Sequence, residues 1–169
     1  MSTQTYLTEN PPIILDATCS TKKIWPRYAS LRMDIKRDVH PDICASAAYL
    51  PFRDRVFQEI YCDPPHMIRH DLGKYPYTSF ARNMERFGAW KDRKEWECFL
   101  DRFNHEAART LKQEGQLRFK LAYGADPRIA KRDGLNRLSA FEITKERITN
   151  AIAPFSNNKT SWLTMRPKS

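Results

Sequence analysis

Hydrophobic residues in the first two thirds of the chain fall in short blocks. These blocks are rich in Val, Ile, Leu, Phe and Tyr, and they are separated by longer polar stretches. Blocks of this kind are typical of strands buried in a mainly parallel sheet. They predict strands over residues 13–16, 31–34, 42–44, 57–62 and 116–121.

One polar stretch between the last two of these strands has the period of an amphipathic helix. Asp92 and Glu95 have the spacing of a capping box, and Gly115 is a natural stop, so we predict a helix over residues 94–115 that covers one sheet face. Its apolar stripe consists of Trp96, Phe99, Leu100, Phe103, Ala107 and Leu111.

The C-terminal third changes to alternating polar and apolar positions. Residues 141–150 and 160–166 predict two strands joined by a polar loop, which indicates a closing antiparallel hairpin. A helix that opens at Asp126 and Pro127 precedes them, weakened by Gly134. Alternating strands and helices predict a three-layer α/β sandwich, built as a single domain over residues 1–169.

Composition adds a partner class to this fold. The 169 residues are 41% hydrophobic, enough for one core, and the formal net charge of +9 favours nucleic acid as a partner. No apolar run approaches a membrane span, and residues 1–12 form a polar extension that does not resemble a signal peptide. We therefore expect no membrane partner, a cytoplasmic location and reduced cysteines.

Cys62, His66 and His70 are candidate ligands for a metal ion. Cysteine and histidine suit zinc, but Asp63-Pro64-Pro65 interrupts any helix between the first two, and a fourth ligand is not obvious nearby. The expectation is that no metal is bound.

Carboxylates end three of the predicted strands. Asp16, Asp34 and Asp63 stand at these ends, where parallel sheets bind ligands. An acid after the second strand commonly accepts hydrogen bonds from ribose hydroxyls, and Asp34 is the candidate. The chain has neither a G-x-G-x-x-G nor a P-loop pattern, so the predicted ligand is a nucleoside cofactor that need not carry phosphate.

The Asp63-Pro64-Pro65-His66 segment predicts an acceptor site for an amino group. Two prolines fix the backbone and remove two N–H donors, so that a carboxylate and carbonyls can face one small volume. The two N–H groups of an adenine or cytosine amine match these acceptors, and His66 could stack on the base. The alternative is that Asp63 caps a turn and the prolines only end the strand.

Residues 67–93 are dense in aromatic and basic side chains and are interpreted as a lid or a substrate-contact insertion. Arg69, Lys74 and Tyr75 are candidates for binding phosphate and an extruded base. The alternative is an amphipathic segment whose apolar residues, Trp90 among them, pack inward.

Several segments in order carry a family resemblance: ILDATCS, MDI, YLPFRDRVFQEIYCDPPHMIR, FGAWKDRKEWECFLDRFNHEAARTLKQEGQLRFK and SWLTMR. Together they resemble a class I S-adenosylmethionine-dependent methyltransferase, nearest to small phage and prophage proteins with an Asp-Pro-Pro-His motif. The resemblance implies a Rossmann-like, mostly parallel seven-stranded sheet and S-adenosylmethionine as cofactor. It implies these roles: Asp16, Ala17, Thr18 and Cys19 in the first cofactor loop, Asp34 at the ribose, Ser46 and Ala47 near the adenine, and Asp63, Pro64, Pro65 and His66 at the amine.

Two positions depart from the family pattern. Ser20 stands where the family usually has glycine, and Ser46 stands where it often has an acid. The leading hypothesis is methyl transfer to an exocyclic amine of a nucleic-acid base, adenine N6 or cytosine N4. The alternatives are a catalytically inactive nucleic-acid-binding or interaction protein of the same fold, and an amino methyltransferase of a protein or a small molecule. A homodimer is left open, as is the choice between DNA and RNA.

Overall fold

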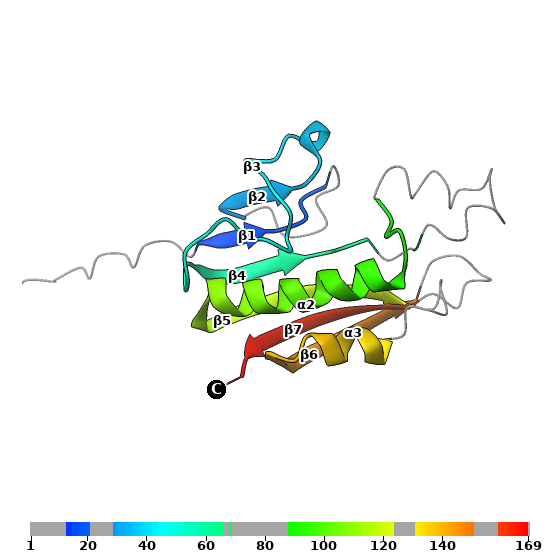
Figure 1. The fold of residues 1–169 in the computed structure, drawn as a ribbon. Coiled ribbons are helices and arrows are strands. Elements are labelled where there is room, and N and C mark those ends of the chain that lie inside the picture. Colours follow the sequence, from blue (N-terminus) through cyan, green and yellow to red (C-terminus); the bar gives the residue numbers. More distant parts are fainter. Residues whose placement is uncertain are drawn as a thin grey trace, which may run out of the picture.

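The sheet is the framework of the molecule. The computed structural model describes residues 13–20, 29–65, 68, 88–123, 131–150 and 159–168. Seven strands form one sheet in the order β3-β2-β1-β4-β5-β7-β6 (Figure 1). They are β1 (Ile14–Asp16), β2 (Leu31–Asp34), β3 (Ile43–Cys44), β4 (Phe57–Cys62), β5 (Leu111–Tyr123), β6 (Phe141–Asn150) and β7 (Lys159–Pro167).

Strand direction divides the sheet into two parts. The pairs from β3 through β5 are parallel, whereas β7 runs antiparallel to both β5 and β6. The predicted Rossmann-like α/β fold, with a mostly parallel seven-stranded sheet and a C-terminal antiparallel hairpin, is confirmed. The parallel pairs bring the carboxyl ends of β1, β2, β4 and β5 to the same edge.

Two helices, α2 (Arg93–Thr110) and α3 (Lys131–Arg137), pack on the same sheet face (Figure 1). The ring of Phe103 in α2 lies 5.7 Å from that of Phe119 in β5. A Cβ at Gly134 of α3 would come within 3.0 Å of Leu121, so glycine permits this close approach. The predicted apolar stripe of α2 is buried along its whole length, and it forms the core with the facing strand residues.

The limits of α2 differ partly from the prediction. Asp92 caps the helix by accepting from the backbone N–H of Glu95 (2.8 Å), as its spacing predicts. The predicted end near Gly115 is wrong, because α2 stops at Thr110 and β5 begins at the next residue.

Gly115 lies in a bulge of β5 and does not end α2. The pairing of β4 with β5 passes from Phe57 opposite Leu111 to Glu59 opposite Gln116, so β5 bulges between these pairs. A Cβ at Gly115 would lie 2.9 Å from a backbone oxygen of this bulge. Close backbone approach, and not helix termination, requires the glycine.

Other predicted segments fall wholly or partly outside the described residues. These are the extension at 1–12, most of the insertion at 67–93 and the start of the predicted helix at Asp126. A short 3-10 helix, η1 (Arg37–Val39), follows β2. None of the helices in the described ranges is long and apolar enough to cross a membrane.

Candidate functional site

A cavity of about 470 Å³ opens at the carboxyl edge of the sheet. This volume lies within the range of small-molecule sites, about 300–1,000 Å³. Asp34, from the end of β2, and Asp63, directly after β4, both line it, so the two carboxylates share one cleft. The other lining residues are Ala17, Thr18, Ser20, Ile35, Lys36, Val39, Ser46, Ala47, Pro64, Pro65, Gly88, Ala89, Trp90, Glu95, Phe99 and Lys120.

Asp34 organises the side of the cavity nearest β1 and β2. Its Oδ2 accepts from the Ser20 N–H and its Oδ1 from the Lys36 N–H, both at 2.9 Å. A carboxylate has about four lone-pair sites, so these two bonds orient the group and leave capacity for two more donors.

The loop after β1 forms the floor of the cavity. Ala17 and Thr18 line it, whereas Asp16 and Cys19 do not. Both of these residues are buried, and the Cys19 N–H donates to the carbonyl of Met33 (2.9 Å). Thr18 joins the loop to the end of β4, because its Oγ1 accepts from the Asp63 N–H at 2.7 Å.

Asp16 is an acid in an unfavourable place for charge. Burial raises the pKa of its carboxyl from 3.8 to about 6, opposed by a hydrogen bond from the Thr18 N–H. The neighbouring carboxylates of Asp34 and Asp63 raise it further. Such a shift, beside a cavity, is common at functional sites and costs stability at neutral pH.

Ser20 occupies the left-handed region of backbone space, with φ of 44°. Glycine takes such a conformation freely, whereas an L side chain pays about 1–2 kcal/mol. The family glycine therefore has a physical reason at this position. In this chain the strained serine still directs its N–H to Asp34, so the loop keeps its shape.

Asp63 is held from one side only. Its Oδ2 accepts from Nζ of Lys120 at 2.8 Å, and both side chains are largely buried. Its Oδ1 is buried and has no hydrogen-bond partner among the described residues. A buried acceptor without a donor is unfavourable, so this atom favours a ligand that brings an N–H or O–H group.

The two prolines after Asp63 were expected to leave free carbonyls facing the acceptor site, and the structure agrees only in part. Both line the cavity, but the carbonyl of Pro65 accepts from the indole N–H of Trp90 and does not face the cavity as a free acceptor. A Cβ at Gly88, where φ is +84°, would meet Pro65 at 3.3 Å. The segment before α2 thus closes over the prolines, and the indole ring packs on Phe99, with ring centroids 4.8 Å apart.

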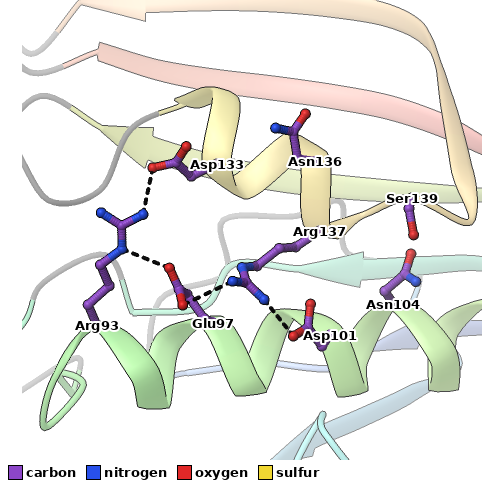
Figure 2. Close-up of a pocket in the computed structure, with 8 residues that line it drawn as sticks. All are labelled: Arg93, Glu97, Asp101, Asn104, Asp133, Asn136, Arg137 and Ser139. Atoms are coloured by element: carbon purple, nitrogen blue, oxygen red, sulfur yellow. Dashed lines mark hydrogen bonds and ion pairs between the residues drawn. The ribbon is translucent and has the colours of Figure 1, made fainter.

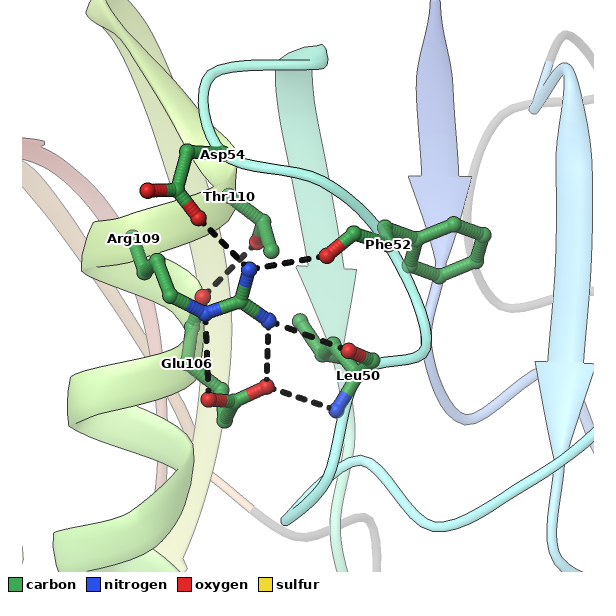
Figure 3. A network of polar contacts seen from close by, with 6 residues as sticks. All are labelled: Leu50, Phe52, Asp54, Glu106, Arg109 and Thr110. Carbon is green, nitrogen blue, oxygen red and sulfur yellow. Dashed lines mark hydrogen bonds and ion pairs between the residues drawn. The ribbon is translucent and has the colours of Figure 1, made fainter.

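Ser46 and Ala47 line the wall nearest β3. Ser46 turns inward on its own loop, because its Oγ accepts from the Ala48 N–H at 3.2 Å. The following segment is fixed to α2 by Arg109, which donates to the carbonyls of Leu50 and Phe52 (Figure 3).

Glu106 and Asp54 complete this network. Glu106 accepts from Arg109 and from the Leu50 N–H, and Asp54 accepts from Arg109 at 2.7 Å (Figure 3). The guanidinium of Arg109 lowers the pKa of Glu106. None of these three charged residues lines the cavity, but the network fixes the segment that follows the cavity wall at Ser46 and Ala47.

Other predicted site residues lie outside the described part of the chain. These are His66, Arg69, Lys74 and Tyr75. Cys62 is fully buried, and burial raises the pKa of its thiol well above the ordinary value, which disfavours a thiolate nucleophile. Lys120 is not among the predicted site residues, because nothing local in the chain pairs it with Asp63, 57 residues away.

A second hollow, of about 550 Å³, lies between α2 and α3. Figure 2 shows that its charged side chains bind one another: Arg93 pairs with Glu97 and Asp133, and Arg137 with Glu97 and Asp101. These ion pairs fasten α3 to α2, and each charged side chain that lines the hollow has a partner of opposite charge.

Comparison with known proteins identifies the fold. No family model matches the chain, and no curated protein matches its sequence. Among solved structures, an S-adenosylmethionine-dependent methyltransferase from Methanosarcina mazei is 16% identical, with a TM-score of 0.54 over 97% of this chain and 96% of that one. Magnesium protoporphyrin IX methyltransferase from Synechocystis, solved with bound S-adenosylmethionine, is 12% identical, with a TM-score of 0.53 over 93% and 70%.

The same fold also carries other chemistry. The cyclase SpnF is 14% identical, with a TM-score of 0.56 over 92% of this chain and 74% of that one. At these identities the likeness establishes the fold, which is that of the class I S-adenosylmethionine-dependent methyltransferases. Activity has to be argued from the site.

Proposed function

We propose that this protein binds S-adenosylmethionine and transfers its methyl group to an exocyclic amino group of a nucleic-acid base. The observation that carries this proposal is that Asp63 lines the same cavity as Asp34 and that its buried Oδ1 has no donor among the described residues. The fold supports the cofactor, and the net charge of +9 supports the nucleic-acid acceptor.

The cofactor half of the cavity fits a nucleoside. Asp34 would hold the ribose hydroxyls with its remaining lone pairs, while Ile35, Val39 and Ala47 offer apolar surface to a base. When bound, the cofactor would supply an electrophilic methyl group.

The acceptor half of the cavity suits an amine. Lys120 holds Oδ2 of Asp63, which leaves Oδ1 to accept one N–H of the acceptor and to orient its nitrogen lone pair. A nucleophilic cysteine is not needed, in agreement with the burial of Cys62.

Two substitutions at the strand ends test these roles. Asp63→Ala should lower the rate of methyl transfer by about 10²–10³-fold, because it removes one preorganised acceptor, and change cofactor affinity little. Asp34→Ala should weaken cofactor binding first. Calorimetry with S-adenosylmethionine and radiolabelled transfer to DNA, RNA and protein fractions measure both effects.

Two controls complete this test. Asp63→Asn keeps an acceptor oxygen and should retain more activity than Asp63→Ala. Glu114→Ala removes an exposed carboxylate that does not line the cavity and should change neither quantity. Absence of cofactor binding to the wild type would overturn the proposal, and transfer to protein alone would replace the acceptor.

A further inference from the structure

The two faces of the C-terminal part of the sheet differ in chemistry. Leu117, Phe119 and Leu121 of β5 are buried on the face that carries α2 and α3. Because side chains alternate along a strand, Arg118 and Lys120 point to the opposite face. That opposite face is called the basic face below.

Strand pairing continues the basic face across β7 and β6. Lys120 lies opposite Trp162, which lies opposite Arg147. Arg118, Thr164 and Lys145 make the next row. Neighbouring strands are about 4.8 Å apart, so each row spans about 10 Å.

Three carboxylates of the described ranges lie near the basic face, and all three are already engaged. Asp63 binds Lys120, Glu59 lies 3.7 Å from Nε of Arg118, and Glu142 pairs with Arg166. Lys145 and Arg147 are both exposed, and neither has an ion pair or a side-chain hydrogen bond with another described residue. As far as the structure describes the chain, β6, the outermost strand of this face, therefore has two cations without a counter-charge.

Trp162 lies between these cations and the cavity. Its indole N–H donates to Oγ1 of Thr149 (3.2 Å), which fixes the ring, and Nζ of Lys120 lies 5.4 Å from the ring centroid. Lys120 also lines the cavity. The row from Arg147 through Trp162 to Lys120 thus leads from the edge strand to the proposed acceptor site.

We infer that the basic face binds the sugar-phosphate backbone of a single nucleic-acid strand, with Lys145 and Arg147 at phosphates and Trp162 as a surface for a base. Cations combined with an aromatic ring are the usual means of binding single strands without sequence preference. This inference rests on the proposed function, because it supplies the surface that would lead a target base to Asp63.

The test measures binding of a fluorescein-labelled single-stranded oligonucleotide to the full chain by anisotropy. DNA and RNA of one sequence serve as separate arms and identify the strand that is bound. The double variant Lys145→Ala/Arg147→Ala should weaken binding about tenfold. It should also reduce the slope of log affinity against log salt by about 1.4, the value for two phosphate contacts on a single strand.

The matched control is Arg132→Ala/Lys168→Ala. It removes the same charge from exposed positions in α3 and after β7, and it should change affinity less than twofold. Equal losses in the two double variants would overturn the inference, because net charge alone would then explain binding. No binding by the wild type would overturn it as well.

Other measurements separate this inference from the proposed function. If the Lys145→Ala/Arg147→Ala variant changes the mass in sedimentation velocity but not oligonucleotide affinity, a second copy covers the face and the inference fails. If the oligonucleotide binds through these residues but calorimetry detects no S-adenosylmethionine binding, the catalytic proposal fails and the basic face stands. If the cofactor binds and a small amine is methylated but neither strand binds, the inference about the basic face fails, methyl transfer to an amine stands, and the nucleic-acid acceptor of the proposed function has to be replaced.

Discussion

The two halves of the sheet are built for different tasks. Strands β1, β2 and β3 have 3, 4 and 2 residues, whereas β5, β6 and β7 have 13, 10 and 9. Short parallel strands end early and leave loops at the carboxyl edge, where Asp16, Asp34 and Asp63 collect. Long antiparallel strands form a continuous ladder that, with α2, holds most of the core.

This division shows how a small chain separates stability from chemistry. The short strands tolerate a strained serine and a buried acid, both of which cost free energy. The buried side chains of the long strands and α2 stabilise the fold and offset this loss of folding free energy. Substitutions in the two halves should therefore differ in size and in pH dependence.

The largest effect is expected in the long-strand half. Phe119 is fully buried against Phe103, so Phe119→Ala should lower the free energy of unfolding by about 3–5 kcal/mol through lost burial and the cavity left behind. Urea denaturation measures this. Ile148→Thr, at a side chain that is 51% exposed in β6, should cost less than about 0.5 kcal/mol. Similar losses in both variants would contradict the assignment of the core.

The next effect belongs to the short-strand half and depends on pH. Because the pKa of Asp16 is raised from 3.8 to about 6, the folded state binds this proton more tightly than the unfolded state. Stability from this group therefore falls as pH rises from about 4 to 6, by about 3 kcal/mol in total. Asp16→Asn should be more stable than the wild type by up to this amount at pH 7 and nearly equal to it at pH 4.

Urea denaturation of the unliganded protein at the two pH values checks this difference. Asp38→Asn replaces an exposed carboxyl in η1 and serves as the control, with the same small effect at both pH values. A difference between Asp16→Asn and the wild type that does not change with pH would show that the carboxyl is not strained by burial.

A smaller effect is expected at the junction of the halves. Arg109 binds Glu106, Asp54 and two backbone carbonyls, so Arg109→Met should cost about 2 kcal/mol by leaving these acceptors unpaired. Arg137→Met removes a guanidinium whose partners among the described residues are two carboxylates and no backbone carbonyl, and it should cost less than about 1 kcal/mol. Equal costs, measured by urea denaturation, would mean that the network in Figure 3 contributes no more than a surface ion pair.

The smallest effect has the opposite sign. Ser20→Gly relieves the backbone strain at φ of 44° but adds freedom to the unfolded chain, so a net gain of about 0.5–1 kcal/mol is expected. Thermal unfolding measures the gain, and Ser30→Gly, at a residue without positive φ, should lower stability. A loss of stability in Ser20→Gly would show that the serine side chain contributes more than the strain costs.

Much of the fold could be predicted because its signals are local. Blocks of apolar residues marked the strands, the spacing of Trp96 to Leu111 marked α2, and Asp92 marked its start. The end of α2 could not be predicted in this way. Gly115 has the form of a helix stop, but pairing with β4 decides that the chain is already a strand at Leu111.

The candidate site was predictable only in its parts. Strand ends indicated Asp34 and Asp63, and the structure places both on one cavity. The partners of Asp63 and Pro65 could not be derived, because Lys120 and Trp90 reach them from distant segments and no local pattern encodes those contacts.

The sequence by itself determined the order of strands and helices, the positive charge and the residue types available for chemistry, since these depend on local pattern and composition. Tertiary structure alone decided which oxygen of Asp63 is paired, that Asp16 is buried, and that Lys145 and Arg147 share a face with Trp162. The reason is that burial and strand register depend on contacts between residues far apart in the chain, and these exist only once the sheet has formed.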